Sequence, residues 1–186
     1  MRAARSRVVA FHRAEVLTCW NLQRVLEHCE RSTPDGMRNY AVLLLLARLG
    51  LRACEIVALT LDDIDWSNGQ ITIRCKGGRW SQLPLPSDVG EAVATYLRFG
   101  RPHCICRRVF LRHRAPIAGF AHSITVSTIV RRALIRAGIE SARKGAHLFR
   151  THSRPTCFGT AHLSMKLANC SGIGAQTRQL CTPRSI

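Results

Sequence analysis

The chain has 186 residues, of which 46% are hydrophobic, and its 28 basic and 11 acidic residues give a formal net charge of +17. This length and composition exclude a fully disordered chain and predict one folded body with at most a short appendage. The charge favours polyanionic partners, of which nucleic acid is the first to consider.

Apolar residues at helical spacing predict a first helix over 22–29. A second helix is predicted over roughly 35–49, with Thr33 as its cap and Gly50 at its end. The almost continuous apolar run over 41–47 indicates that this helix is buried on most sides.

A short helix is expected over 52–59, followed by an acidic turn with the sequence LDDIDWSNG. The alternating sequence QITIR predicts a strand over 70–74, and KGGR predicts a tight turn. The sequence WSQLPLP over 80–86 then predicts the partner strand of a hairpin.

An amphipathic helix is predicted over 87–97, and residues 101–119 form an irregular, arginine-rich segment. A last helix begins near Ser123 and ends at Gly138, with an apolar stripe along one side. The sequence therefore predicts an α+β fold that is mainly α, with a small antiparallel β-hairpin or sheet.

Neither a membrane protein nor a metal protein is indicated. The longest apolar block is flanked by Arg38 and Arg48, and charged residues interrupt any signal-peptide core near the N-terminus. Of the nine cysteines only Cys104 and Cys106 lie close together, without a second pair at zinc-site spacing. We expect a cytoplasmic protein with reduced thiols, no metal, no other cofactor and no membrane partner.

Four motifs in order resemble the catalytic domain of the tyrosine recombinases, the phage integrase family. They are ARLGLRACEIVALTLDDIDW, KGGR, LPLP and HLFR, and the resemblance runs from about Leu22 to Arg150. It implies that residues 21–150 form this domain, that residues 1–20 are an irregular remnant, and that the tail 151–186 lies outside the family pattern. DNA recombination and integration, as in a mobile element, are the implied activity.

The resemblance implies cleavage of one DNA strand by a tyrosine, without metal or ATP, while arginines stabilise the phosphate charge. Arg52 and Arg150 match the two clamp arginines of the family, and Lys76 matches the lysine that protonates the leaving 5′-oxygen. His147 matches the histidine that assists proton transfer. Glu55 either orients Arg52 or forms an ordinary helix ion pair.

DNA is the predicted partner, through phosphate contacts that are weakly selective for sequence. The alternative for each basic residue is an ordinary solvated side chain. The predicted DNA-binding residues are Arg52, Lys76, Arg79, Arg131, Arg132, Arg136 and Arg150.

The family pattern fails after Arg150, where a helix and the tyrosine nucleophile should follow. The only tyrosines are Tyr40 and Tyr96, and residues 151–186 contain no Asp or Glu. Reading a back-translation of this tail one base earlier permits a sequence that resembles the missing segment. We therefore interpret the tail as the product of a single-base deletion near codon 150, which makes the chain a pseudogene product that is catalytically inactive.

Two other functions stay open. The chain could be an inactive subunit that forms a homo- or hetero-oligomer with intact recombinases. It could also be a basic RNA-binding or structural protein unrelated to recombination, which is favoured if Arg52, Lys76, His147 and Arg150 do not converge in the fold.

Overall fold

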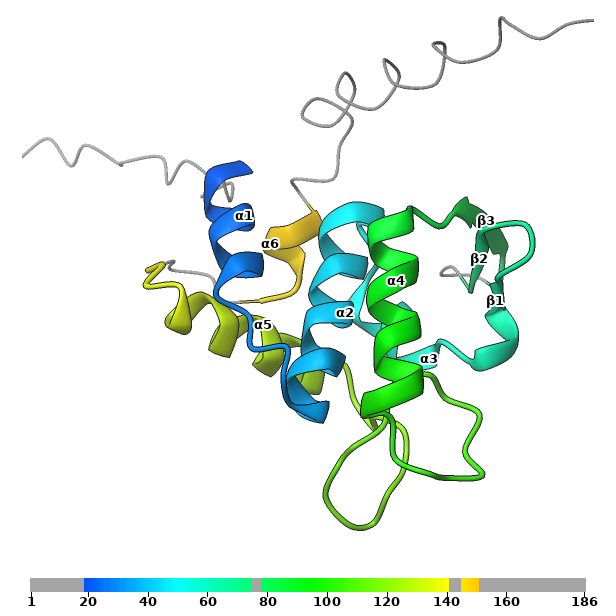
Figure 1. Cartoon of the computed structure of the whole chain (residues 1–186). Coiled ribbons are helices and arrows are strands. Elements are labelled where there is room, and N and C mark those ends of the chain that lie inside the picture. The colour runs from blue at the N-terminus through cyan, green and yellow to red at the C-terminus, as the bar shows by residue number, and fades with distance from the viewer. Residues whose placement is uncertain (1–18, 75–77, 141–144, 151–186) are drawn as a thin grey trace, which may run out of the picture.

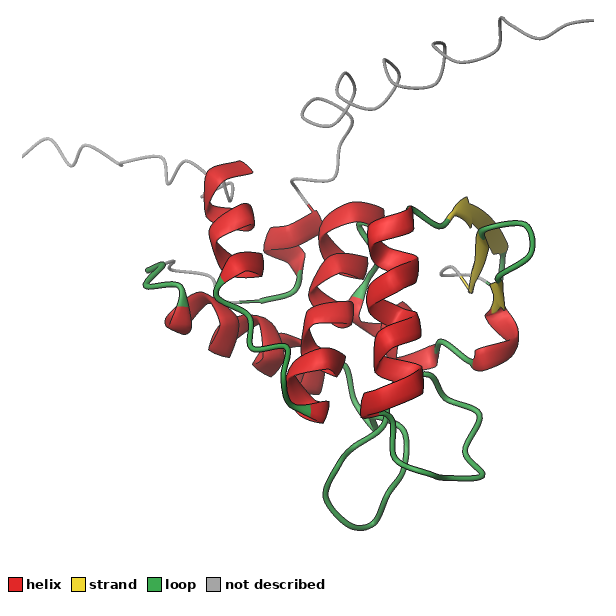
Figure 2. Cartoon of the chain, in the orientation of Figure 1, coloured by secondary structure: helices red, strands yellow, loops and turns green. Residues whose placement is uncertain are grey.

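The computed structural model describes residues 19–74, 78–140 and 145–150. Figure 2 shows a body of helices with one small sheet at its edge. This confirms the predicted fold class. The predicted tail 151–186 and nearly all of the predicted N-terminal remnant lie outside the described residues. None of the described helices is long and apolar enough to cross a membrane.

Helix α2 (Pro34–Leu49) is the central helix, and local signals set both of its ends. The Thr33 hydroxyl accepts a hydrogen bond from the Gly36 N–H at 3.1 Å, and Pro34 occupies the first turn, where its missing N–H costs nothing. Gly50 ends the helix in the left-handed region at φ 61°, which favours glycine. Every residue from Ala41 to Ala47 is buried, as the apolar run predicts.

The other helices cover α2 (Figure 1). Helix α4 (Ser87–Thr95) packs along one side, and α1 (Cys19–Glu27) and α5 (Ile124–Arg136) pack against the other. The stripe predicted for α5 is buried: Val126, Ile129, Val130, Ala133 and Leu134. The predicted helix over 87–97 continues further, because α4 passes into a π-helical turn, η2 (Tyr96–Gly100).

The sheet has three antiparallel strands in the order β1–β2–β3. Strands β2 (Gln70–Arg74) and β3 (Trp80–Pro84) form the predicted hairpin, with Arg74 opposite Trp80. Lys76 and Gly77 of the predicted KGGR turn lie outside the described residues. The acidic segment before β2 forms a 3₁₀ turn, η1 (Leu61–Asp63), and a short strand, β1 (Ile64–Asp65), that the sequence does not predict.

Residues 101–119 have little regular structure, as predicted, yet hydrogen bonds tie them to the body. The Arg101 guanidinium donates to the carbonyl oxygens of Cys106 and Arg108. A single β-bridge joins Arg108 to Thr60, and another joins Leu111 to Gly119. The Thr60 bridge joins this segment to the residue before η1, and Arg38 of α2 donates to the Leu111 carbonyl oxygen at 3.1 Å.

Candidate functional site

Arg52 is held at the N-terminus of the short helix α3 (Ala53–Ala58), just after the Gly50 turn. One carboxylate oxygen of Glu55 accepts from the Arg52 backbone N–H at 2.7 Å, and the other accepts from Arg52 Nη1 at 2.8 Å. Glu55 is 7% exposed, whereas the Arg52 side chain is 42% exposed. The predicted contact is thus present, and a buried carboxylate fixes a guanidinium that faces solvent.

Arg52 and His147 line the same pocket, of about 230 Å³, although they are far apart in the sequence. Ser127 of α5, Ala146 and the two neighbours of Arg52 in sequence also line this cavity, which we call the Arg52 pocket. His147 is exposed at the start of helix α6 (His147–Arg150). Buried Leu148 and Phe149 anchor α6 in the core, so the imidazole is carried on a fixed backbone.

The other predicted site residues, Lys76, Arg79, Arg131 and Arg150, are not among the described residues that line the Arg52 pocket. Arg150 ends α6, and its side chain lies outside the described part; Lys76 also lies outside the described residues. Arg79 is exposed next to β3. Arg131 is exposed one helical turn after Ser127, on the same side of α5 as the Arg52 pocket.

Arg132 and Arg136 are not part of the Arg52 pocket. They line a second cavity of about 460 Å³ between the start of α2, the segment 112–120 and α5, which we call the arginine pocket. Its arginines are Arg38, Arg112, Arg114, Arg132 and Arg136. Sequence reasoning missed the contributions of Arg38, Arg112 and Arg114, although the excess of arginine in residues 101–119 was visible as a signal.

Both tyrosines of the sequence are engaged away from the Arg52 pocket. Tyr96 is fully buried, its hydroxyl accepts from the Leu111 N–H at 3.2 Å, and burial raises the pKa of the phenol. The ring of Tyr40 lies 3.8 Å from the Arg31 guanidinium, in a cavity beside α4. Neither tyrosine is among the described residues that line the Arg52 pocket.

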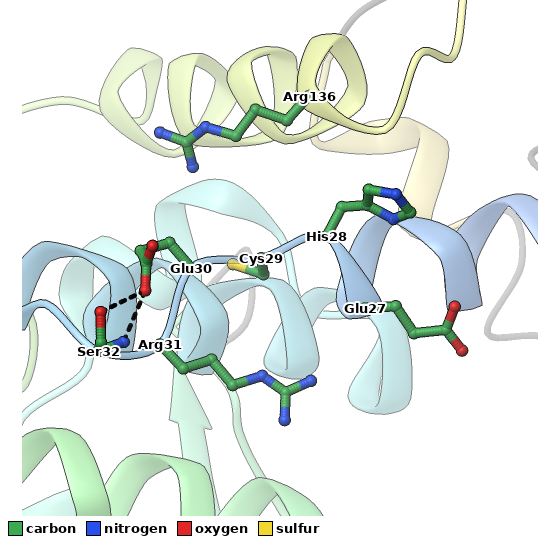
Figure 3. A pocket seen from close by; sticks show the side chains of 7 residues that line it. All are labelled: Glu27, His28, Cys29, Glu30, Arg31, Ser32 and Arg136. Carbon is green, nitrogen blue, oxygen red and sulfur yellow. Dashed lines mark hydrogen bonds between the residues drawn. The ribbon is translucent and has the colours of Figure 1, made fainter.

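Another hollow lies between the α1–α2 connection and the end of α5 (Figure 3). Glu30 accepts hydrogen bonds from the Ser32 hydroxyl at 2.6 Å and from its N–H at 2.8 Å, and these bonds lower the pKa of Glu30. Within the described ranges, no cluster of three or more His, Cys, Asp or Glu side chains could hold a metal ion.

Known proteins are similar to this chain in sequence and in fold. The protein y4rA of Sinorhizobium fredii (strain NBRC 101917 / NGR234), whose name places it among the integrases/recombinases, is 55% identical over 130 residues, covering 70% of this chain and 32% of y4rA. Tyrosine recombinase XerC of Oceanobacillus iheyensis is 31% identical over 140 residues, covering 70% of this chain and 45% of XerC. The chain spans between about a third and two thirds of the length of y4rA and of two further Sinorhizobium fredii relatives, y4gC and y4rF.

The fold is similar to that of the XerH site-specific recombinase in a post-cleavage complex with palindromic difH substrate. The TM-score is 0.63 at 20% identity, over 75% of this chain and 41% of XerH. The sequence model of the phage integrase family matches residues 15–155, a range that includes the Arg52–Glu55 contact, His147 and the sheet. On this match and on the similarity to y4rA and XerC, the chain belongs to the phage integrase family, whose members include the tyrosine recombinases.

Proposed function

We propose that this chain is a DNA-binding domain of the site-specific recombinase type, with Arg52, Lys76, His147 and Arg150 around one DNA phosphate. The observation that carries the proposal is the Arg52 pocket, where α3 and α6 present a guanidinium and an imidazole to the same cavity. Residues 21–150 are the proposed catalytic domain, and DNA is the proposed partner. The DNA in the XerH complex supports this choice.

The arrangement suits a phosphodiester. A guanidinium places two parallel N–H donors against two phosphate oxygens, and it stabilises the negative charge that gathers during phosphoryl transfer. Glu55 holds Arg52 in place before DNA arrives, so little reorganisation is needed on binding. In the proposed mechanism His147 donates to a third phosphate oxygen, and Lys76 protonates the leaving 5′-oxygen.

Cleavage also needs a nucleophile, and we propose that the 186-residue chain does not supply one. Tyr96 is buried with its hydroxyl in a hydrogen bond, and Tyr40 lies in another cavity. The tail 151–186 contains no tyrosine. The chain would then bind DNA without cutting it, as expected of a pseudogene product with a deletion near codon 150.

The binding part of the proposal is tested with a labelled DNA duplex and the Arg52→Gln variant. We expect weaker binding and a dependence of log affinity on log salt concentration that is shallower by about one. The matched control is Arg98→Gln, which removes an exposed arginine of η2. Equal effects of the two variants would contradict a role for the Arg52 pocket.

The cleavage part is tested with a nicked suicide substrate that traps any covalent protein–DNA link. We expect no adduct from this chain alone, and a recovered adduct would refute its inactivity. Sequencing the gene from an independent isolate tests the deletion, because an intact reading frame with the same tail would exclude it.

A second proposed role is that of a non-cleaving subunit that assembles with intact recombinases, because the lambda integrase fragment of similar fold is a dimer bound to a core site. A pull-down with a full-length relative tests this assembly. Co-purification that requires a shared DNA site is the expected result, and no association at any DNA concentration would eliminate it.

A further inference from the structure

We propose that the arginine pocket is a second anion site, which binds backbone phosphates of a nucleic-acid segment other than the one at Arg52. This goes beyond the proposed function, because it requires neither Arg52 nor strand cleavage. Five arginines and, among the described residues, a single carboxylate line the cavity. Such an imbalance of charge around a concave surface attracts anions.

Two of the arginines build the pocket rather than await a ligand. Arg38 donates to Asn39 Oδ1 and to the Leu111 carbonyl, its side chain is only 11% exposed, and its guanidinium lies 5.3 Å from the centre of the Phe120 ring. Arg112 donates to the Pro116 carbonyl at 2.7 Å. Its Nε is buried and has no hydrogen-bond partner within the described residues.

The other three arginines carry the proposed binding. Arg114, Arg132 and Arg136 are exposed, and their side chains take part in none of the ion pairs or hydrogen bonds found within the described ranges. Each therefore keeps its full set of donors for a ligand. Guanidinium donors match phosphate oxygens in pairs, which gives geometric specificity as well as charge.

The nearby carboxylates are already engaged. Asp35, the carboxylate in the lining, lies 2.7 Å from Arg38 Nη2 and 3.1 Å from His113 Nδ1. Glu30, beside Arg136 in the adjoining hollow, is bound by Ser32, and no bond joins it to Arg136 (Figure 3). Neither carboxylate therefore forms an ion pair with the three exposed guanidiniums among the described residues, and the charge of Arg136 is only a minor cause of the lowered pKa of Glu30.

Its place on α5 separates this pocket from the first one. Ser127 lines the Arg52 pocket, and Arg132 lines the arginine pocket five positions later, which is about 140° around a helix. The buried stripe of α5 lies between these two sides. A phosphate at Arg132 therefore lies on a different side of α5 from a phosphate at Arg52.

Nucleic acid is the ligand that the charge favours. A net charge of +17 suits a polymer that carries one negative charge per repeat, because each neutralised phosphate also releases counterions. A cavity of about 460 Å³ with three exposed arginines at its surface suits successive phosphates of a strand better than a single carboxylate.

The test compares two double variants of the full chain that lose the same charge. Arg132→Gln/Arg136→Gln removes two of the guanidiniums that line the arginine pocket, whereas Arg24→Gln/Arg98→Gln removes two exposed arginines outside it. With a labelled duplex in fluorescence anisotropy, we expect the first variant to lower affinity about tenfold and to reduce the salt slope by about two. The control should change both quantities much less, and equal losses would overturn the proposal.

Competition identifies the ligand. Unlabelled duplex should displace the label from the Arg52→Gln variant, in which the second site remains, far better than pyrophosphate at equal phosphate concentration. Equal displacement by pyrophosphate, or tighter binding of a polyglutamate peptide, would overturn nucleic acid as the ligand. If Arg132→Gln/Arg136→Gln binds DNA normally while Arg52→Gln is impaired, the proposed second anion site is wrong and the proposed function stands. If Arg52→Gln binds normally while Arg132→Gln/Arg136→Gln is impaired, the proposed function is wrong and the second anion site stands.

Discussion

The Arg52 pocket and the arginine pocket lie on two sides of α5 and differ in how their guanidiniums are held. Arg52 is fixed by the buried carboxylate of Glu55 through two hydrogen bonds. Arg114, Arg132 and Arg136 have no such partner among the described residues. A guanidinium held by a carboxylate is suited to positioning one reacting phosphate. Guanidiniums without such a partner have a charge that no carboxylate offsets, so they attract anions more strongly.

The two kinds of arginine depend on different interactions. Burying Glu55 is tolerable only because Arg52 satisfies it, so the pair depends on both members. The exposed arginines of the second pocket depend on water and salt, and their mutual repulsion is screened at physiological ionic strength. Variants can therefore separate structural from electrostatic roles.

The largest expected effect comes from α2, which packs against α3, α5 and α6, helices that carry side chains of the two pockets. Leu45→Ala removes a side chain that is fully buried, and we expect a loss of about 2–5 kcal/mol in the free energy of unfolding. Urea unfolding followed by tryptophan fluorescence measures it. Phe99→Ala, at a 72% exposed side chain, is the control and should change stability by about 0.5 kcal/mol or less. If the Leu45→Ala chain kept DNA binding at one pocket under conditions that unfold it, the two pockets would not belong to one cooperatively folded unit.

The next effect sharpens the contrast at Glu55. Glu55→Gln removes the charge that holds Arg52, and we expect a loss of about 1–3 kcal/mol because a hydrogen bond between two charged groups is replaced by a weaker one. Glu91→Gln, at an exposed position of α4, is the control. Equal unfolding curves for the two variants would mean that Glu55 does not hold Arg52 in solution.

A smaller effect is expected at the turn between α2 and α3. Gly50→Ala places a side chain at φ 61° and should lower the free energy of unfolding by about 1 kcal/mol. Gly90→Ala lies within α4, where an added methyl group meets only Leu85 at ordinary contact distance, so we expect stabilisation by about 0.5–1 kcal/mol. Opposite signs in calorimetry are the expected result. The same sign for both would exclude the turn as the cause.

The smallest effect concerns pH and the arginine pocket. Burial, and then the charge of Arg38, lower the pKa of His113 below its ordinary value of 6.5. As pH falls below that value the unfolded chain takes up a proton before the folded chain does, so His113 makes stability decline. His113→Gln should flatten this part of the profile of unfolding free energy against pH. An unchanged profile would show that the imidazole is not shielded as its burial implies.

Much of the fold follows from short-range signals. The Thr33 cap and the Gly50 stop define α2, the apolar stripe identifies the buried side of α5, and the glycine turn predicts the β2–β3 hairpin. These features depend on neighbouring residues, so their pattern is readable along the chain. The strand β1 was missed because its two residues are too few to show an alternating pattern. The π-helical extension of α4 was missed because it depends on the packing of Tyr96 against the later segment at Phe110 and Leu111.

The candidate site divides in the same way. Motif order indicated Arg52 and His147 as members of one site, and the contact with Glu55 followed from a spacing of three residues. By itself, the sequence determined the family, the main helices and an excess of positive charge. Only the tertiary structure decided that Arg132 and Arg136 join Arg38, Arg112 and Arg114 instead of Arg52, because the direction of a side chain around α5 matters only once its neighbours are packed.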